Sequence, residues 1–191
     1  MTDPPPSLTA SQTVGPYVSI GLFRALVGPE LVERSDPRAV VIRGLLLDGE
    51  GEVVPDGMIE IWQANAAGRY ASEFDARGDV PLEDGFLGFG RSSTADGGAF
   101  EFVTVKPGPV PWPHGGLQAP HLEVGIFARG LLKRIVTRMY FPDAAEANAA
   151  DPVLSGLDQA ARDTLIPVDE GGVLRFDIRL QGPGQTTFFA V

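Results

Sequence analysis

The sequence contains no cysteine, which excludes disulfide bonds, thiolate metal sites and cysteine nucleophiles. Histidine is nearly as scarce, because His114 and His121 are the only two in the chain. Basic residues are also few, with 15 against 25 acidic ones, which gives a formal net charge of −10. This balance argues against nucleic acid and anionic membranes as main partners, since phosphate binding needs a basic face.

Long apolar runs are missing as well, since no stretch approaches the length of a membrane span. The first residues, MTDPPPSL, lack the basic region and apolar core of a signal peptide. We therefore expect a soluble cytoplasmic protein with no membrane partner. What is present suits a globular protein, because 43% of the 191 residues are hydrophobic. No composition shift or internal repeat marks a boundary, so residues 1–191 are predicted to form a single domain.

Short strands separated by turn signals dominate the pattern. Apolar or alternating segments, typical of strands, occur at 39–47, 58–63, 86–94, 100–105, 121–127, 132–141 and 173–180. Residues 143–166 are rich in alanine and acidic side chains, and they fit one or two short helices. The pattern predicts an all-β protein, a two-sheet sandwich with short helical excursions. Residues 1–36, interrupted by Gly-Pro pairs, are predicted to form an N-terminal arm.

The best candidate for a site lies between Thr104 and Arg138. A loop rich in proline and glycine, PGPVPWPHGG, precedes a strand that begins at His121, and loops held by rigid strands often carry function. From residue types alone, a histidine at a strand start is more often structural than a ligand. We expect His114 to be solvated, and Arg134 and Arg138 to lie on an exposed strand edge.

Other features give no sharper signal. Trp62 is expected to be an ordinary packing aromatic, and the acidic loop from Glu73 to Asp84 a solvated surface. No phosphate-binding glycine loop, catalytic Ser/His/Asp order or histidine pair at metal spacing is present. Residue types alone therefore indicate an acidic β-sandwich and no particular activity.

Five segments carry more information together: SQTVGPY (11–17), IEIWQANAAGRY (59–70), TVKPGPVPW (104–112), APHLEVGIFARG (119–130) and RFDIRLQGPGQTTFF (175–189). In this order, and over nearly the whole chain, they resemble the intradiol aromatic-ring dioxygenases. That family's fold is a β-sandwich, which agrees with the strand pattern. Its chemistry uses a mononuclear ferric ion held by two tyrosines and two histidines. In catalytic chains the motifs are G-R-Y, P-G-x-Y-P-W and H-x-H.

Two of the four ligand positions differ in this chain. Tyr70 matches the first tyrosine and His121 the first histidine, but Val110 replaces the second tyrosine and Glu123 the second histidine. Valine offers no donor atom, and a carboxylate stands where an imidazole belongs. Because ligand number and type decide which metal binds, we expect no metal site in this chain. The remaining polar groups are expected to hydrogen-bond one another or the backbone.

This pattern resembles the iron-free alpha chains of the two-chain family members. Such chains complete an active site at the interface with an iron-bearing beta chain, in a higher-order alpha–beta assembly. The resemblance implies that Fe(III) is bound by the partner beta chain, and that the arm over 1–36 packs on that partner. It also implies that Thr13, Gly15, Pro16 and Arg129 line the partner's substrate pocket.

The implied roles of these residues suit an aromatic substrate. Gly15 allows close backbone approach to a flat ring, and Pro16 stiffens the arm. Arg129 offers a fixed positive charge to a benzoate-type carboxylate. The implied reaction is the cleavage of 3,4-dihydroxybenzoate by O2 to 3-carboxy-cis,cis-muconate, in the beta-ketoadipate pathway of aromatic catabolism.

Two other functions stay open. One is a self-sufficient intradiol catechol dioxygenase with an altered ligand set that uses Tyr70, His121 and Glu123. The other is a non-catalytic β-sandwich that serves as a binding or structural module. Iron bound by the chain alone would distinguish the self-sufficient enzyme from an iron-free subunit. A binding or structural module predicts that Arg129→Ala in the assembled complex leaves KM and turnover unchanged.

Overall fold

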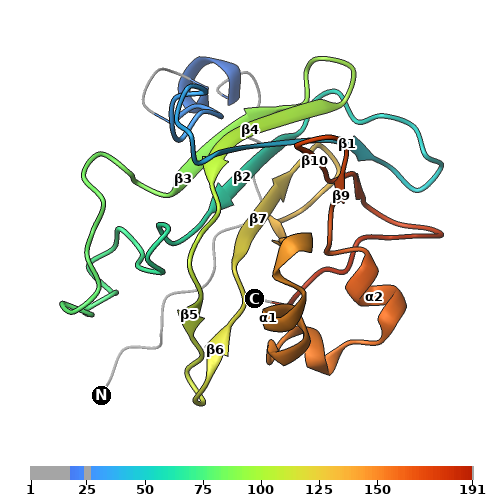
Figure 1. Ribbon diagram of the computed structural model, residues 1–191. Helices are drawn as coiled ribbons and strands as arrows, with labels where there is room; N and C mark the ends of the chain where they lie inside the picture. Colours follow the sequence, from blue (N-terminus) through green and yellow to red (C-terminus); the bar gives the residue numbers. More distant parts are fainter. Residues whose placement is uncertain (1–17, 24–26, 191) are drawn as a thin grey trace, which may run out of the picture.

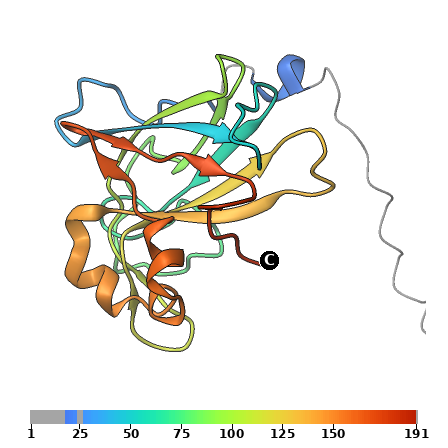
Figure 2. The same cartoon turned by 90° about the vertical axis from the view of Figure 1, so that its right-hand side faces the viewer.

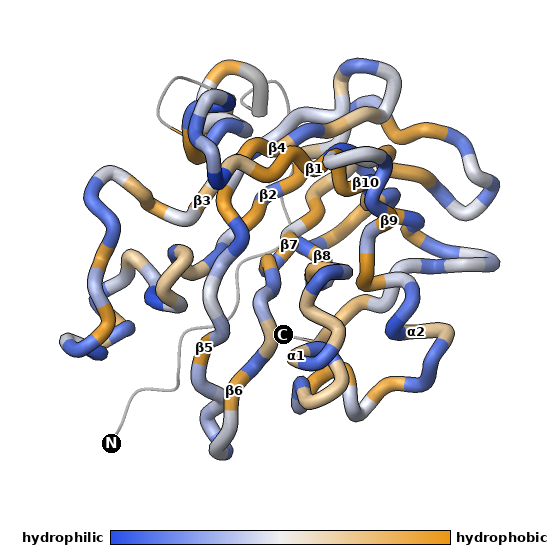
Figure 3. Tube along the Cα trace, in the orientation of Figure 1, coloured by the Kyte–Doolittle hydropathy of each residue, from blue (hydrophilic) through white to orange (hydrophobic). Residues whose placement is uncertain are grey.

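Two sheets face each other across the main hydrophobic core of the computed structural model, which describes residues 18–23 and 27–190 (Figures 1 and 2). Fully buried side chains of both sheets meet in this core, including Ile42 and Phe102 from one sheet and Ile59 and Ile126 from the other. Hydrophobic residues follow the strands, while hydrophilic residues gather in the connecting loops (Figure 3). The predicted all-β sandwich with short helices is confirmed.

The first sheet is built around β1 (Ala39–Leu47). This strand pairs antiparallel with β4 (Ala99–Val105) and parallel with β10 (Val173–Arg175) and β11 (Ile178–Arg179), while β9 (Val168–Asp169) continues the sheet beyond β10. The sequence pattern predicted one continuous strand over 173–180, and that prediction is wrong. The chain bends at Phe176 and Asp177, where the Asp177 carboxylate, in place of a backbone carbonyl, accepts a hydrogen bond from the Leu45 amide.

The second sheet has the order β3-β2-β7-β8, formed by β3 (Phe89–Ser93), β2 (Met58–Trp62), β7 (His121–Phe127) and β8 (Ile135–Tyr140). Neighbouring strands are antiparallel throughout. Because side chains alternate along a strand, Ile59 and Val124 point into the core while Glu60 and Glu123 lie on the outer face. The register aligns four residues across this outer face, in the order Phe89, Trp62, Glu123 and Arg138.

Short elements cover one end of the sandwich (Figure 1). A two-stranded hairpin combines β5 (Val110–Pro111) with β6 (Leu117–Gln118), and β6 lies next to α1 (Ala145–Ala150). A second short helix, α2 (Gln159–Asp163), follows later in the chain. Two 3-10 turns, η2 (Pro142–Ala144) and η3 (Leu154–Gly156), flank α1, and a five-residue π turn, η1 (Val18–Leu22), lies near the start of the chain. A second small core of Ala119, Tyr140, Leu154 and Leu165 lies beneath this end.

Both ends of the described chain contact the sandwich. Near the start, the Gly28 carbonyl accepts from the Arg91 amide of β3, and the Leu31 amide donates to Val103 of β4. Near the end, the Phe189 amide donates to the Val136 carbonyl at 2.8 Å, so the apolar tail is held against the second sheet. Over the residues described, the structure has no helix that combines the length and apolar character needed to cross a membrane.

Candidate functional site

The four predicted ligand positions lie together on the outer face of the second sheet. Tyr70, Val110 and Glu123 line one cavity of about 890 Å³. His121 lies beside it, with Nε2 3.6 Å from Oε1 of Glu123. The fold thus gathers four residues from three segments of the family resemblance into one site, even though two of these residues do not match metal ligands.

Two glycines bring the loops of Tyr70 and Val110 against each other. Gly68 has a positive φ of 84°, and a Cβ there would lie 2.2 Å from the Pro109 carbonyl oxygen. A Cβ on Gly108 would lie 2.6 Å from the Gly68 nitrogen. The backbone carbonyl of buried Asn65 accepts hydrogen bonds from both glycine amides, each at 2.9 Å. Only residues without a side chain allow the two backbones to approach this closely, which explains why glycine occupies positions 68 and 108.

Tyr70 is a neutral phenol that faces the cavity. Its ring packs edge to face against Trp62, with 5.4 Å between centroids. Burial, together with the negative charge of Glu123, raises the pKa of Tyr70 to about 12. Among the described residues the phenol oxygen has no hydrogen-bond partner, so the expected bond to a neighbour is not seen. In the absence of a metal ion, this environment therefore keeps the phenol protonated at neutral pH.

His121 is buried and fixed by the backbone. Its Nδ1 lies 2.7 Å from the Ala119 carbonyl oxygen, as expected for a structural histidine. Its ring packs against the ring of Tyr140, with 5.6 Å between centroids. Nε2, the nitrogen nearer Glu123, has no hydrogen bond among the described residues. This unpartnered nitrogen belongs to the residue that matches the family's first histidine ligand.

Arg138 occupies the centre of the site, which corrects the prediction that it lies on an exposed edge. Its side chain is 15% exposed, and Nη2 lies 2.6 Å from Oε1 of Glu123. Nη1 donates to Oε1 of Gln118 at 2.8 Å and to the Tyr140 hydroxyl at 3.3 Å. The strand pattern placed Arg138 and Arg134 on one face correctly, and Arg134 is indeed exposed. The pattern did not show that the β5–β6 hairpin covers this end of the face.

The position of Arg138 beside Glu123 could have been inferred from the pairing of the two strands that carry them. β7 and β8 follow each other in sequence and pair antiparallel, which sets Glu123 directly opposite Arg138. The chain turns at Arg129 and Gly130, where the Leu131 amide donates to the Ala128 carbonyl at 3.2 Å. The strand predicted over 132–141 is shorter, since β8 begins only at Ile135.

Glu123 and Arg138 form a stable ion pair. Burial alone would raise the pKa of Glu123, but the neighbouring His121 imidazole and the charge of Arg138 outweigh it and hold that pKa below its usual value. Burial alone would lower the pKa of Arg138, and the Glu123 charge more than offsets this. Both groups are therefore charged at neutral pH, and a guanidinium supplies the positive charge beside the carboxylate.

This set of residues does not fit a ferric ion. Val110 offers no donor and the Glu123 carboxylate is bound to Arg138, so only Tyr70 and His121 match the family's ligand set. Within the described part of the chain, no group of three or more His, Asp or Glu side chains is arranged to hold a metal. The ligand count and type that ferric iron requires are therefore not met by these residues.

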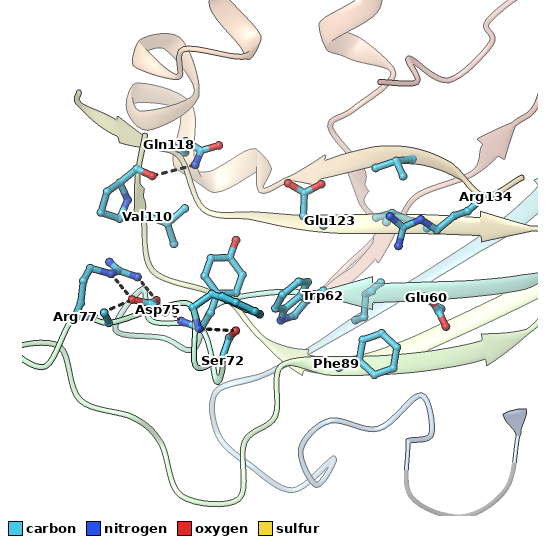
Figure 4. A pocket seen from close by; sticks show the side chains of 18 residues that line it. Glu60, Trp62, Ser72, Asp75, Arg77, Phe89, Val110, Gln118, Glu123 and Arg134 are labelled. Carbon is cyan, nitrogen blue, oxygen red and sulfur yellow. Dashed lines mark hydrogen bonds and ion pairs between the residues drawn. The ribbon is translucent and has the colours of Figure 1, made fainter. Parts of the chain in front are cut away.

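The cavity walls include residues that the sequence did not single out (Figure 4). Trp62, predicted to be an ordinary packing aromatic, is 43% exposed and lines the cavity beside Phe89. The loop predicted to be a solvated surface contributes Asp75 and Arg77, which form an ion pair at 2.5 Å. His114 is exposed, as predicted.

The residues predicted to reach a partner lie elsewhere. Arg129 follows β7, at the end of that strand opposite His121, and does not line the cavity. Its side chain is 83% exposed, and Nε lies 2.9 Å from Oδ2 of Asp56. Thr13, Gly15 and Pro16 lie outside the described residues, so their predicted roles stay predictions.

Comparison with known proteins identifies the family. The family described as "Dioxygenase" matches residues 31–182. A Pseudomonas putida protein named protocatechuate 3,4-dioxygenase alpha chain is 42% identical, over 95% of this chain and 95% of its own length. The chain belongs to the intradiol dioxygenase family. It is also 41% identical to a Burkholderia cepacia protein named protocatechuate 3,4-dioxygenase beta chain, over 77% of this chain and 66% of that one.

A solved structure has a similar fold. The dioxygenase domain of a dioxygenase and carbohydrate-binding fusion protein from Streptomyces sp. SirexAA-E aligns with a TM-score of 0.57 at 24% sequence identity. The alignment covers 94% of this chain and 99% of that domain. The likeness shows that this chain shares the fold of that dioxygenase domain.

Proposed function

We propose that this chain is the iron-free alpha subunit of a protocatechuate 3,4-dioxygenase, and that a beta partner binds the Fe(III). The observation that carries the proposal is the Glu123–Arg138 ion pair, at 2.6 Å, beside a valine at a second ligand position. The similarity to a protein named as an alpha chain, over nearly the full length of both chains, gives the subunit type. The similarity to a beta chain of the same enzyme suits two related subunits in one assembly.

The assembled enzyme would insert both atoms of O2 into 3,4-dihydroxybenzoate. The bond between the two hydroxylated carbons breaks and 3-carboxy-cis,cis-muconate forms, a step of aromatic catabolism in the beta-ketoadipate pathway of the cytoplasm. None of the described residues of this chain takes part in bond breaking in this proposal. Its contribution is to shape the partner's pocket and to hold the assembly together.

Arg129 is the described residue best suited to reach a partner's substrate. Its side chain is largely exposed, and the Asp56 carboxylate that it contacts is itself 40% exposed. Exposed ion pairs contribute about 0 to 1 kcal/mol, so a substrate carboxylate can replace Asp56 at little cost. Thr13, Gly15 and Pro16 complete the proposed contact set, which forms the interface between this chain and the beta chain's pocket.

The direct test is to purify the chain alone, the beta chain alone and the co-expressed pair, and to measure O2 consumption with 3,4-dihydroxybenzoate. The pair should turn over substrate, and this chain alone should not. Turnover by this chain alone would establish the self-sufficient enzyme instead. If the beta chain alone matched the KM and kcat of the pair, this chain would be a structural module.

A further inference from the structure

The cavity beside the Glu123–Arg138 pair is large enough to hold a small organic molecule. Its volume of about 890 Å³ lies within the range of small-molecule binding sites. Aromatic rings form much of its wall, from Trp62 and Phe89 on the sheet and Tyr70 and Phe74 on the covering loop. Such walls suit a flat, largely apolar ligand.

The charges around the cavity are paired, with one exception. Three carboxylates line it, and each is bound to an arginine: Glu60 to Arg91 at 2.6 Å, Asp75 to Arg77 at 2.5 Å, and Glu123 to Arg138 at 2.6 Å. Arg134 is the remaining charged residue of the lining, and no carboxylate of the described residues lies within ion-pair distance of it. The cavity therefore keeps one uncompensated positive charge, in a chain whose net charge is −10.

The sheet holds Arg134 over the outer face. Its side-chain stem crosses Gly125, where a Cβ would lie 3.1 Å from Cδ of the arginine. Gly125 is two residues from Glu123 on β7, so the missing side chain opens a path for the stem along this face. In Figure 4 the guanidinium is directed along β7 toward the side of Glu123 and Trp62, and Val110 lies at the far end of the cavity.

One hydrogen-bonding group in the wall is also free. Tyr70 lines the cavity, and its hydroxyl has no hydrogen-bond partner among the described residues. Gln118, by contrast, is occupied by the Pro111 carbonyl and by Arg138. A ligand that places an oxygen near Tyr70 gains a hydrogen bond without displacing one.

We propose that this cavity is a metal-independent binding site for a small aromatic carboxylate, with the ring beside Trp62 and Tyr70 and the carboxylate at Arg134. The inference stands on the described residues alone and does not depend on the proposed subunit function.

The test is a calorimetric titration of the full chain with benzoate, and separately with its uncharged analogue benzamide. Benzoate should bind with a Kd of roughly 0.1 to 1 mM, a modest affinity expected for so small a ligand. Benzamide should bind about tenfold more weakly, because it cannot pair with a guanidinium. In a Trp112→Phe background, benzoate should still change the fluorescence of Trp62.

Two variants test whether Arg134 is the cation that binds the benzoate carboxylate. Arg134→Ala should weaken benzoate binding about tenfold and leave benzamide binding unchanged, while Lys133→Ala, a neighbouring exposed cation outside the lining, should change neither. Equal affinities for benzoate and benzamide, no binding up to about 10 mM, or no effect of Arg134→Ala would each overturn the proposal.

A second measurement covers the case in which the isolated chain does not fold. The co-expressed alpha–beta pair is then titrated, and Arg134→Ala should lower the number of benzoates bound per pair by one. An unchanged number would overturn the proposal. This arm alone rests on the proposed assembly, whose own failure would be visible separately as the absence of a complex.

Discussion

The guanidinium of Arg138 lies 2.6 Å from the carboxylate of Glu123, directly across the ladder between β7 and β8. Glu123 stands where the family's catalytic chains carry their second histidine. Because the Glu123 carboxylate is already paired with Arg138, a metal ion would have to compete with this guanidinium for it. The positive charge of Arg138 therefore balances the Glu123 carboxylate on the outer face, and no metal ion is needed for this.

Replacing Arg138 with methionine should destabilise the fold by about 2 to 4 kcal/mol, because a largely buried carboxylate loses its partner. The double change Glu123→Met and Arg138→Met should recover at least half of that loss, since no unpaired charge remains. Urea unfolding of the three proteins measures this. Arg129→Met, which breaks an exposed pair, is the control and should cost less than about 1 kcal/mol. A single Arg138 change as mild as the control would contradict this account.

The Asp75–Arg77 pair predicts a specific acid dependence. Hydrogen bonds from Arg77, opposed by burial and supported by the Tyr70 amide, hold the pKa of Asp75 well below its usual value. Because the folded-state pKa is the lower one, the contribution is complete above about pH 4 and is lost as pH falls below that. Asp75→Asn should therefore cost about 1 to 3 kcal/mol at pH 7, and the difference from wild type should shrink toward pH 2.

The matched control for Asp75 is Asp79→Asn, a nearby exposed carboxylate with no ion pair among the described residues. It should leave the pH profile of unfolding unchanged. A difference between Asp75→Asn and wild type that stayed constant from pH 7 to pH 2 would show that the ionised form of Asp75 is not what stabilises the loop.

Arg129 should act through charge on a substrate that another chain holds. In the assembled complex, Arg129→Ala should raise KM for 3,4-dihydroxybenzoate about tenfold, and leave KM for catechol, which lacks the carboxylate, unchanged. Lys133→Ala, in the same β7–β8 loop, serves as the control. Equal effects on both substrates would point to a structural role at the interface.

The Gly108 contact should set the position of both loops. Gly108→Ala should destabilise the protein by about 1 to 3 kcal/mol, because the new methyl group meets backbone atoms of Ala66, Ala67 and Gly68. Gly78→Ala is the control, since nothing lies within 4 Å of a Cβ at that position. Thermal and urea unfolding measure both, and equal stabilities would mean that the two loops move apart easily.

Much of the fold follows from local patterns in the sequence. Strands 39–47 and 121–127 were predicted with the bounds that the structure shows, because apolar runs and flanking turns are local signals. The strand over 173–180 failed because the break at Phe176 depends on Gly44, a residue far away in sequence. A close approach between distant backbones leaves no mark in the pattern of either segment.

The site was predictable only in part. The resemblance identified Tyr70, Val110, His121 and Glu123, and the structure brings them together. It did not reveal Arg138, whose burial depends on covering loops from elsewhere in the chain. The aromatic cavity was missed for the same reason, since its walls come from a strand and from a loop whose composition is that of an exposed surface.

The central claim is that this chain holds no iron site of its own. Its most direct test is to load the isolated chain and the co-expressed alpha–beta pair with Fe(III), remove free metal, and measure bound iron together with visible absorption. The account predicts a colourless chain with far less than stoichiometric iron, and a coloured pair with iron bound. Stoichiometric ferric iron and visible tyrosinate absorption in the isolated chain would contradict it.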